Sequence, residues 1–419
     1  MLSIELIRKE QDFVKAAMHN RGENIVFTSM LEIDAKRRRY IVQRDALRSR
    51  RNEVSKKIGR MREKPQDLIE EMRQVGDEIK NLDDQTKAVQ AELNSILLTI
   101  PNIPLDSVPK GTGESQNIVV REFGQLEQLT FEALPHWDLG ERLDIIDFER
   151  GAKLSGSRFY ILKGMGAKLE RALISWMLDV HTKKHGYTEI SPPYLVKQET
   201  MLASGNLPKF ADNLYQDTED DLWLIPTAEV PLTSLHRNEI IQSEKLPLYY
   251  TAYTPCFRRE KASAGKDTRG IKRVHQFGKV EMYKFVEPTT SNMELEKLIN
   301  DAEDICRMLS IPYRIIELCT GDLGFNAAKT YDLEMWAAGS QEWLEVSSCS
   351  NCTDFQARRA NIKYRSSDQN KTQFVHTLNG SGLALPRVII AILENYQQSD
   401  GSVLIPEVLR PYTGFDLIR

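Results

Sequence analysis

Two short segments near the middle of the sequence carry arginine, aromatic and carboxylate side chains with a spacing that suits nucleotide binding. Residues 257–260 read FRRE, and residues 274–281 read VHQFGKVE. An arginine on a rigid strand can hold a phosphate bidentately, and an aromatic ring offers a face for a nucleobase. The two segments therefore predict a site for a nucleotide or an RNA end. For Arg258 alone, a structural hairpin with a solvated basic turn is an equally good interpretation.

Two further segments place oxygen ligands in short, constrained stretches. Residues 225–232 (IPTAEVPL) hold Thr227 and Glu229, which could bind the ammonium group of an amino acid; a helix N-cap at Thr227 is the alternative. Residues 343–349 (WLEVSSC) alternate like a strand, with Glu345 and Ser347 on one face and Ser348 opposite or after a bend. Carboxylate and hydroxyl oxygens suit Mg²⁺.

A glycine-rich turn followed by an apolar helix is expected over residues 378–394 (LNGSGLALPRVIIAILE). The glycines allow the backbone to approach a ligand closely. Arg387 lies in the first turns of this helix, where a buried guanidinium needs an anionic partner. A role in ligand binding is therefore favoured for Arg387.

The elements that must position these residues are also visible. Alternating apolar residues over 254–285 predict two strands joined by a basic loop, from Lys261 to Arg273, with Gly265 and Gly270 as possible hinges. Residues 169–185 predict a helix with one apolar face. This helix stops at Gly186 and is followed by a strand that ends at a Pro-Pro pair, residues 192–193.

The N-terminal part predicts a short amphipathic helix within residues 1–25 and then a long helical hairpin. Apolar residues recur every seven positions, which is typical of a coiled-coil seam, and Pro65 marks the reversal between two helices of roughly 30 residues. The first helical series is Ile33, Tyr40, Leu47, Val54 and Met61; the second helix combines Leu68, Val75, Leu82, Val89 and Ile96 with Met72, Ile79, Thr86, Leu93 and Ile100.

Charge is divided unevenly between these two helices. Residues 30–64 contain thirteen Lys and Arg against five acidic residues, a net of +8, whereas residues 67–93 contain three against eight, a net of −5. The surplus can face RNA phosphates, or the flanking charges can pair across the seam. Both arrangements are compatible with a projecting rod.

Composition sets the broad class of protein. The chain has 419 residues, 41% hydrophobic and 28% charged, and a net charge of −4, which is ordinary for a folded, soluble protein of two or three domains. We expect no signal peptide and no membrane span, and a cytoplasmic location. Five cysteines form a sparse set. Cys349 and Cys352 have zinc-like spacing but lack a second ligand pair, so buried thiols are expected and zinc is not.

These motifs together resemble class II aminoacyl-tRNA synthetases, and in particular the bacterial-type seryl-tRNA synthetases, over essentially the full length. The helix and strand at 169–196 resemble motif 1, residues 254–285 motif 2 and residues 378–394 motif 3. Also specific in combination are TAE at 227–229 and EVSSCSNCTDFQARR at 345–359. Arg259 departs from many relatives, which have a small residue there.

The resemblance implies a role for each matching residue. Arg258 would bind the ATP α-phosphate, Glu260 would face the adenine amine, Phe277 and Arg387 would enclose the adenine ring, and Arg258 and Arg387 would be the catalytic pair. The remaining expected residues are, for ATP, Arg259, Val274, Glu345, Val346, Ser347 and Ser348; for Mg²⁺, Glu345 and Ser348; for L-serine, Thr227, Ala228, Glu229, Glu281 and Ser381; and for tRNA, Arg48, Arg51, Lys56 and Arg60.

The resemblance also implies an α+β fold: an antiparallel coiled-coil arm and a catalytic domain built on a mixed, mainly antiparallel β-sheet flanked by helices. We expect a tRNA-binding domain at 1–105 with its hairpin at about 30–100, a linker at 106–117 and a catalytic domain at 118–419. The implied activity is ATP-dependent ligation of serine to tRNA(Ser), and to tRNA(Sec) where it exists, through a seryl-adenylate. A homodimer is implied through residues 169–196.

Three alternatives remain open at this point. A catalytically silent relative that binds RNA would share the fold but should have lost site residues. A ligase that loads a carrier protein would be expected to lack the basic arm. Another class II specificity, such as threonine or proline, is the nearest enzymatic alternative. His275 is expected to pack or to hydrogen bond rather than to act in catalysis.

Overall fold

A computed structural model describes residues 1–63, 65–126, 129–261, 269–366 and 371–419. The chain divides into two compact units. The N-terminal unit comprises Leu2–His19 and Glu23–Ile100, and the C-terminal unit comprises Met1, Asn20–Gly22 and Pro101–Arg419. Each unit is described separately below.

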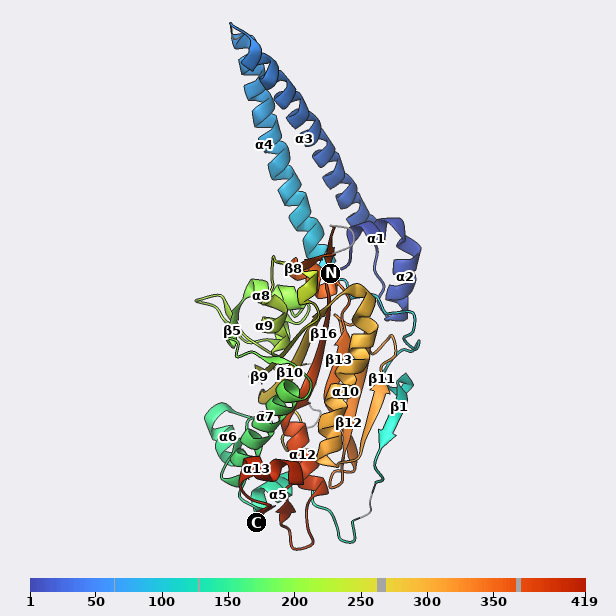
Figure 1. The fold of residues 1–419 in the computed structure, drawn as a ribbon, viewed down its shortest axis with the longest axis vertical. Coiled ribbons are helices and arrows are strands. Elements are labelled where there is room, and N and C mark those ends of the chain that lie inside the picture. Colours follow the sequence, from blue (N-terminus) through green and yellow to red (C-terminus); the bar gives the residue numbers. More distant parts are fainter. Residues whose placement is uncertain (64, 127–128, 262–268, 367–370) are drawn as a thin grey trace. The chain divides into compact units, whose positions relative to one another are not determined.

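The N-terminal unit is helical. The expected single helix within residues 1–25 is two helices, of which the first begins where the Ser3 side chain accepts a hydrogen bond from the Leu6 amide. The long hairpin is confirmed, and Pro65 directly precedes its second helix (Figure 1). The four helices are α1 (Ile4–Lys9), α2 (Gln11–Asn20), α3 (Thr28–Arg60) and α4 (Gln66–Leu97).

The seam between α3 and α4 is less apolar than the heptads suggest. Along α3, half-buried side chains recur at alternating intervals of four and three residues, and apolar residues alternate with arginines in this row until Ile58. Met61 lies beyond the end of α3 and is 45% exposed, so the expected seam position there is wrong. The row comprises Ile33, Arg37, Tyr40, Arg44, Leu47, Arg51, Val54 and Ile58.

Charges do pair across this seam. The Arg44 and Arg48 guanidinium groups contact the Asp83 carboxylate at 3.4 and 2.8 Å, and Arg50 pairs with Glu71. The basic surplus of α3 is therefore only partly neutralised by α4. Lys56 and Arg60 are exposed, whereas Arg51 lies half-buried in the seam row.

The C-terminal unit is built on an eight-stranded, mainly antiparallel sheet, as expected from the sequence. Only the β4–β9 pair in this sheet is parallel. Its strands, in spatial order, are β1 (Ile118–Phe123), β11 (Tyr313–Glu317), β12 (Lys329–Ala337), β13 (Glu342–Asn351), β16 (His376–Ala384), β10 (Gln276–Val286), β9 (Leu248–Phe257) and β4 (Thr188–Glu189).

Smaller strands surround this sheet. They form the pairs β2 (Ile146–Asp147) with β3 (Ile161–Leu162) and β17 (Val403–Leu404) with β18 (Leu417–Ile418), and two three-stranded sheets: β5 (Leu195–Lys197), β7 (Leu222–Leu224) and β6 (Gln216–Asp217); and β15 (Thr372–Phe374), β14 (Lys363–Arg365) and β8 (Ile240–Gln242).

Side chains alternate between the two faces of the central strand β10. Val280, Met282 and Val286 are buried in the large core that also contains residues of α7, α10 and α12. Tyr283 and Phe285 point the other way, into a second core beside α9 and α11. Because the period of a strand is two, Phe277, Lys279 and Glu281 share the face of Tyr283. One face of β10 therefore packs into the large core, and the other carries Lys279 and Glu281 before it enters the second core at Tyr283.

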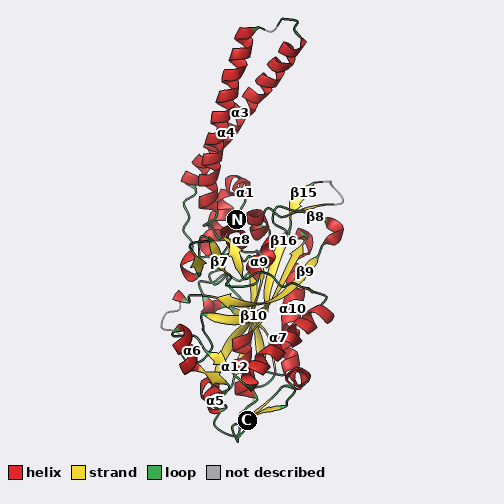
Figure 2. Cartoon of the chain, turned by 90° about the vertical axis from the view of Figure 1, so that its left-hand side faces the viewer, coloured by secondary structure: helices red, strands yellow, loops and turns green. Residues whose placement is uncertain are grey.

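Helices cover both faces of the sheet. Figure 2 shows α7 and α10 beside the yellow strands. Pro386 occupies the first turn of α12, where the missing amide hydrogen costs nothing. The helices are α5 (His136–Arg142), α6 (Phe148–Ser155), α7 (Met165–Lys183), α8 (Gln198–Ser204), α9 (Glu229–Ser234), α10 (Ser291–Leu309), α11 (Phe355–Ala360), α12 (Leu385–Asn395) and α13 (Arg410–Thr413).

The expected hairpin is formed by β9 and β10, which pair antiparallel from Phe257–Gln276 to Leu248–Phe285. Most of the basic loop, residues 262–268 with Gly265 and Lys266, lies outside the described residues. Within the described part of the chain, no helix combines the length and the apolar character needed to cross a bilayer.

The carboxylate of Asp34 ties α1 to α3 in the N-terminal unit. It is fully buried and accepts hydrogen bonds from Arg8 at 2.8 Å, Arg37 at 2.8 Å and Arg38 at 3.1 Å. Burial alone would raise the pKa of Asp34, but the hydrogen bonds from Arg37 and Arg8 lower it below 3.8. The Asp34 carboxylate therefore links α1 to α3 through buried, charged hydrogen bonds.

We expect Asp34→Asn to destabilise the N-terminal unit by about 2 kcal/mol, because charged hydrogen bonds to a buried carboxylate are lost. Hydrogen exchange of the α1 and α3 amides should accelerate. Asp45→Asn is the control, since Asp45 is exposed and pairs with Arg44 at the surface. The Asp34 contribution should be complete above pH 4 and lost as the pH falls through the lowered pKa. Equal exchange in both variants would contradict the assigned role.

Candidate active site

Residues from distant segments of the C-terminal unit line one cavity of about 370 Å³. The cavity lies on the polar face of β10 and is bounded by the end of β9, the start of α9, β13, β16 and the start of α12. Its lining residues are Thr227, Glu229, Arg258, Glu260, Lys272, Arg273, Val274, Phe277, Lys279, Glu281, Glu345, Val346, Ser348, Asn379, Ser381, Ala384, Pro386 and Arg387.

At one end of the cavity, three buried polar groups from β10 and the segment before α9 are hydrogen bonded to one another. The Thr227 hydroxyl donates to Glu281 Oε2 at 2.7 Å. The Lys279 ammonium donates to Thr227 Oγ1 at 2.8 Å and pairs with the Glu281 carboxylate. Because Lys279 and Glu281 are two residues apart on a strand, both point into the cavity. The group presents fixed oxygen acceptors to a ligand.

Glu229 adds a second carboxylate to this end of the cavity. Burial, and then the charge of Glu281, raise the pKa of Glu229 to about 7, against the opposing influence of Lys279. When both carboxylates are ionised, they exceed the charge of Lys279 by one. This end is therefore suited to a ligand that carries one positive charge, such as an amino acid ammonium group.

The side chain of Gln356 on α11 holds Glu229 in place. Its amide nitrogen donates to Glu229 Oε1 at 2.5 Å, and its amide oxygen accepts hydrogen bonds from the Tyr283 hydroxyl at 2.9 Å and the Thr377 hydroxyl at 2.7 Å. Two hydroxyl donors fix which end of the amide carries the oxygen. Asn379 contributes a further donor to Glu229 Oε1 at 3.2 Å.

At the other end of the cavity, arginine and aromatic side chains meet. The Arg258 guanidinium lies 5.1 Å from the centre of the Phe277 ring, and its Nε donates to the Pro226 carbonyl at 3.2 Å. Arg273 lies 3.7 Å from the Glu260 carboxylate. This end offers cations for phosphate and a ring face for a base.

Arg387 has the anionic partner that the sequence required. Its Nη1 donates to the Glu345 carbonyl at 2.5 Å and lies 3.3 Å from the Glu345 carboxylate. Since Arg387 begins α12 and Glu345 lies on β13, this contact joins two sides of the cavity. Glu345 remains about half exposed, at 47%, and is accessible to a ligand.

The expected sharing of one face by Glu345 and Ser347 is wrong. A β-bulge in β13 sets Glu345 opposite Glu334 and Ser347 opposite Leu333, so that Val346 is the extra residue. The bulge turns Ser348, not Ser347, into the cavity beside Glu345. Ser347 is 1% exposed and donates to the Ser381 carbonyl at 2.6 Å.

The oxygens of Glu345 and Ser348 fit the requirements of Mg²⁺. A carboxylate and a hydroxyl are hard donors, and Mg²⁺ is commonly held by few protein ligands together with substrate phosphates and water. Both side chains line the same cavity as Arg258 and Arg387. The pair could therefore hold a metal ion in the same cavity as the two arginines.

Three expected site residues lie elsewhere. Ser347 is described above, and Ala228 is fully buried before α9. Arg259 turns away: its Nε donates to the Leu214 carbonyl at 2.7 Å and its guanidinium lies over the Tyr215 ring. All other residues expected for ATP, serine and Mg²⁺ line the cavity. Lys272 and Arg273, from the expected basic loop, also line the cavity. The sequence interpretation missed Lys279, Asn379, Ala384 and Pro386 among the lining residues, and Gln356 behind them.

The alternatives for His275 and the cysteines have clear outcomes. His275 Nδ1 lies 3.0 Å from the Arg258 carbonyl, so it supports the strand end by hydrogen bonding, as expected. Cys349 and Cys352 are buried, as expected, and burial raises the pKa of both thiols. The Thr227 hydroxyl both receives the Glu229 amide, at 3.2 Å, and donates to Glu281. The N-cap of α9 is Ala228, which has no side-chain capping hydrogen bond, so the N-cap alternative for Thr227 is wrong.

Comparison with known proteins identifies the family of both parts of the chain. Residues 1–104 match the seryl-tRNA synthetase N-terminal domain, and residues 209–396 match the tRNA synthetase class II core domain (G, H, P, S and T). The chain is 55% identical to a serine--tRNA ligase of Dehalococcoides mccartyi over 419 residues, covering 100% of both chains. It is 58% identical to that of a Roseiflexus species, with 100% of both chains covered.

Solved structures give the same result. Seryl-tRNA synthetase from Pyrococcus horikoshii complexed with ATP has a TM-score of 0.91 at 40% identity, covering 100% of this chain and 99% of that one. A cytoplasmic serine-tRNA ligase from Naegleria fowleri in complex with AMP has a TM-score of 0.86 at 32% identity, with the same coverage. From its motifs, its cavity and its full-length relatives, this chain belongs to the seryl-tRNA synthetase family of class II aminoacyl-tRNA synthetases.

Proposed function

We propose that this protein ligates L-serine to tRNA in two ATP-dependent steps through a seryl-adenylate. The observation that carries the proposal is the convergence of Arg258, Glu281, Glu345 and Arg387 on one cavity. Its carboxylate end suits an amino acid and its arginine end suits a nucleotide. The ATP and AMP bound to the two related synthetases support the same assignment.

In the first step, a serine carboxylate oxygen attacks the α-phosphorus of ATP, a phosphorus–oxygen bond forms, and pyrophosphate leaves. No side-chain nucleophile is needed, because Arg258 would hold the α-phosphate and, together with Arg387, offset developing negative charge. Glu345 and Ser348 would hold Mg²⁺, which would supply positive charge to neutralise the phosphates. In the second step, a terminal ribose hydroxyl of tRNA attacks the acyl carbon, and AMP leaves with the electron pair of the broken bond.

Selection of serine follows from the acceptors at the carboxylate end. Glu229 would pair with the ammonium group, and Glu281, held by Thr227 and Lys279, would accept the hydrogen of the serine hydroxyl. A site built to hydrogen bond a hydroxyl disfavours alanine, which leaves the acceptor unpaired. A tight pocket opposes the extra methyl group of threonine.

The helical hairpin is proposed to bind the tRNA through the backbone of its long variable arm. The exposed basic residues Arg48, Lys56 and Arg60 on α3 support this role, and Arg51 would have to act from the seam row. The substrates are tRNA(Ser), and tRNA(Sec) where it exists. We further propose a cytoplasmic homodimer that associates through residues 169–196, on α7 and the edge strand β4.

The variant Arg258→Ala should lower serine-dependent ATP–pyrophosphate exchange about a hundredfold or more, since a pre-positioned cation is lost from the phosphate end. The fold should be intact by circular dichroism. The control is Arg237→Ala, which removes a surface arginine paired with Glu199 outside the cavity. Near-normal exchange in Arg258→Ala would refute the role, and a panel of amino acids in the same assay tests the choice of serine.

The pH dependence of serine use should follow Glu229. Its raised pKa means that the carboxyl group keeps its proton below about pH 7 and is ionised above it. We therefore expect kcat/KM for serine to fall about tenfold for each pH unit below 7, because a neutral carboxyl cannot balance the ammonium charge. In Gln356→Leu, which removes a hydrogen bond that lowers this pKa, the midpoint should move to higher pH. Identical profiles in the two proteins would show that Glu229 is not the group being titrated.

Removal of residues 30–100 should leave serine-dependent exchange intact and lower transfer to tRNA about a hundredfold or more, because phosphate contacts supply much of the affinity for nucleic acids. The double substitution Lys56→Ala with Arg60→Ala should weaken tRNA binding and reduce its salt dependence. The matched control removes two exposed lysines of α4, Lys80 and Lys87. Undiminished transfer by the deletion variant would show that the hairpin is not needed to bind tRNA.

A further inference from the structure

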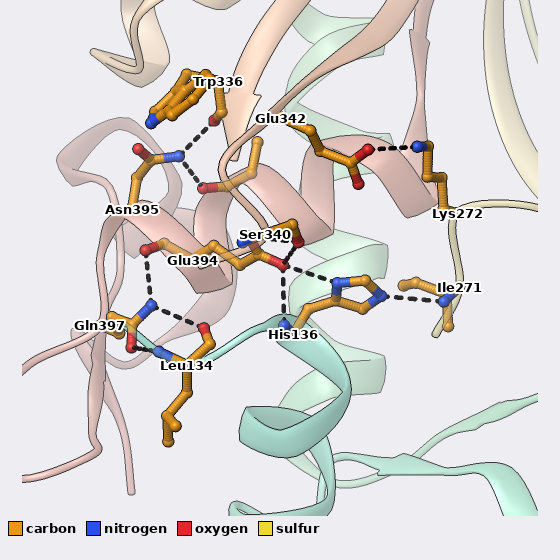
Figure 3. Close-up of polar contacts among 11 residues, drawn as sticks. Leu134, His136, Ile271, Lys272, Trp336, Ser340, Glu342, Glu394, Asn395 and Gln397 are labelled. Atoms are coloured by element: carbon orange, nitrogen blue, oxygen red, sulfur yellow. Dashed lines mark hydrogen bonds and ion pairs between the residues drawn. The ribbon is translucent and has the colours of Figure 1, made fainter. Parts of the chain in front are cut away.

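A buried carboxylate, Glu394, gathers hydrogen bonds at the end of α12. It accepts from the His136 amide at 2.9 Å and from His136 Nδ1 at 2.8 Å, and from the Ser340 amide at 2.7 Å, as Figure 3 shows. Burial alone would raise the pKa of Glu394, but these donors lower it below its ordinary range. The carboxylate is therefore ionised, and its oxygens accept hydrogen bonds from the start of α5 and from the turn after β12.

The imidazole of His136 bridges Glu394 to the returning end of the motif 2 loop. The Ile271 amide donates to His136 Nε2 at 3.1 Å. Nε2 must then carry a lone pair, so the single ring proton is on Nδ1, which faces Glu394 (Figure 3). His136, Ile271 and Glu394 are each 1% exposed or less, so water does not compete for these bonds.

Gly270 makes this contact possible. Its φ is +73°, a conformation that side chains disfavour, and a Cβ added there would lie 2.0 Å from His136 Nε2. The absence of a side chain at residue 270 is what lets the imidazole reach the next amide. The hydrogen bond between His136 and the Ile271 amide therefore requires glycine at residue 270.

The bridged backbone leads directly into the cavity. Lys272, Arg273 and Val274 follow Ile271 and line the phosphate end, and Lys272 Nζ is held by Glu342 Oε2 at 2.6 Å. Glu394 lies two turns after Arg387 on the same helix. One imidazole therefore connects the residues after the motif 2 loop with the helix that carries Arg387.

We propose that His136 is a positioning residue for ATP, which acts through the Ile271 backbone to hold Lys272, Arg273 and Val274 against the nucleotide. The inference rests on the proposed function, in that it presumes ATP at this end of the cavity. His136 lies outside the cavity lining and touches no substrate. Its effect should thus appear in the affinity for ATP and not in that for serine.

The test compares His136→Leu with His136→Gln in serine-dependent ATP–pyrophosphate exchange. Leucine removes both hydrogen bonds, and KM for ATP should rise about tenfold, the loss expected for a buried hydrogen bond to a backbone amide. Glutamine can donate to Glu394 with its nitrogen and accept from Ile271 with its oxygen, so it should restore KM for ATP to within about threefold of the wild type. KM for serine should be unchanged in both variants.

The controls separate positioning from stability and from the proposed function itself. His236→Leu removes another histidine–glutamate contact, with Glu239, away from the cavity and should leave KM for ATP unchanged. If His136→Leu is too unstable to assay, the ratio of KM for ATP to KM for serine is compared between Gly270→Ala and His136→Gln. This ratio should rise in Gly270→Ala and stay close to the wild-type value in His136→Gln. A Gly270→Ala ratio equal to that of the wild type would overturn the proposal, as would equal rises of both KM values in His136→Leu. A wild-type protein without serine-dependent exchange would instead refute the function.

Discussion

The alternation of side chains along β10 is the constraint on which the rest of the site depends. Val280 and Met282 are buried in the large core on one face of the sheet. Lys279 and Glu281 alternate with them along the strand and therefore face the cavity. A shift of one residue in register would place two charges in the apolar core and two apolar side chains in the cavity. The hydrophobic contacts of the core thus set the position of the polar groups above it, before any ligand is present.

The charges on that face need a second layer of support. Burial, and then repulsion by the Glu281 carboxylate, raise the pKa of Glu229 to about 7. Lys279 offsets one charge, and the amide of Gln356 donates to the other. Because the oxygen of this amide is committed to Tyr283 and Thr377, it cannot rotate to place an acceptor against Glu229. The cavity is therefore prepared for a cation in the absence of one.

Sequence patterns predicted what depends on local chemistry and missed what depends on tertiary contact. The β9–β10 hairpin, the long α3–α4 hairpin and α12 all have a local periodicity, and each is confirmed. Lys279 could have been found, since it lies two residues from both Phe277 and Glu281 on one strand. Gln356 could not, because its partners come from other elements. The bulge that turns Ser348 into the cavity in place of Ser347 depends on the pairing of β13 with β12. A search for apolar heptads does not detect the arginines in the α3 row.

The two ends of the cavity differ in how their backbones are held. Lys279, Glu281 and Ser381 lie on β10 and β16, where ladder hydrogen bonds on both strands fix the main chain. Lys272 to Val274 precede β10 and belong to no described strand, and the His136 contact with the Ile271 amide helps to fix the backbone that leads into them. An ionised, buried carboxylate that orients a neutral imidazole is a strong anchor, since each of its bonds would leave an unpaired buried group if broken. Polar support of the His136 kind is therefore expected for the backbone of Lys272 to Val274, whereas the sheet itself holds the backbone of Lys279, Glu281 and Ser381.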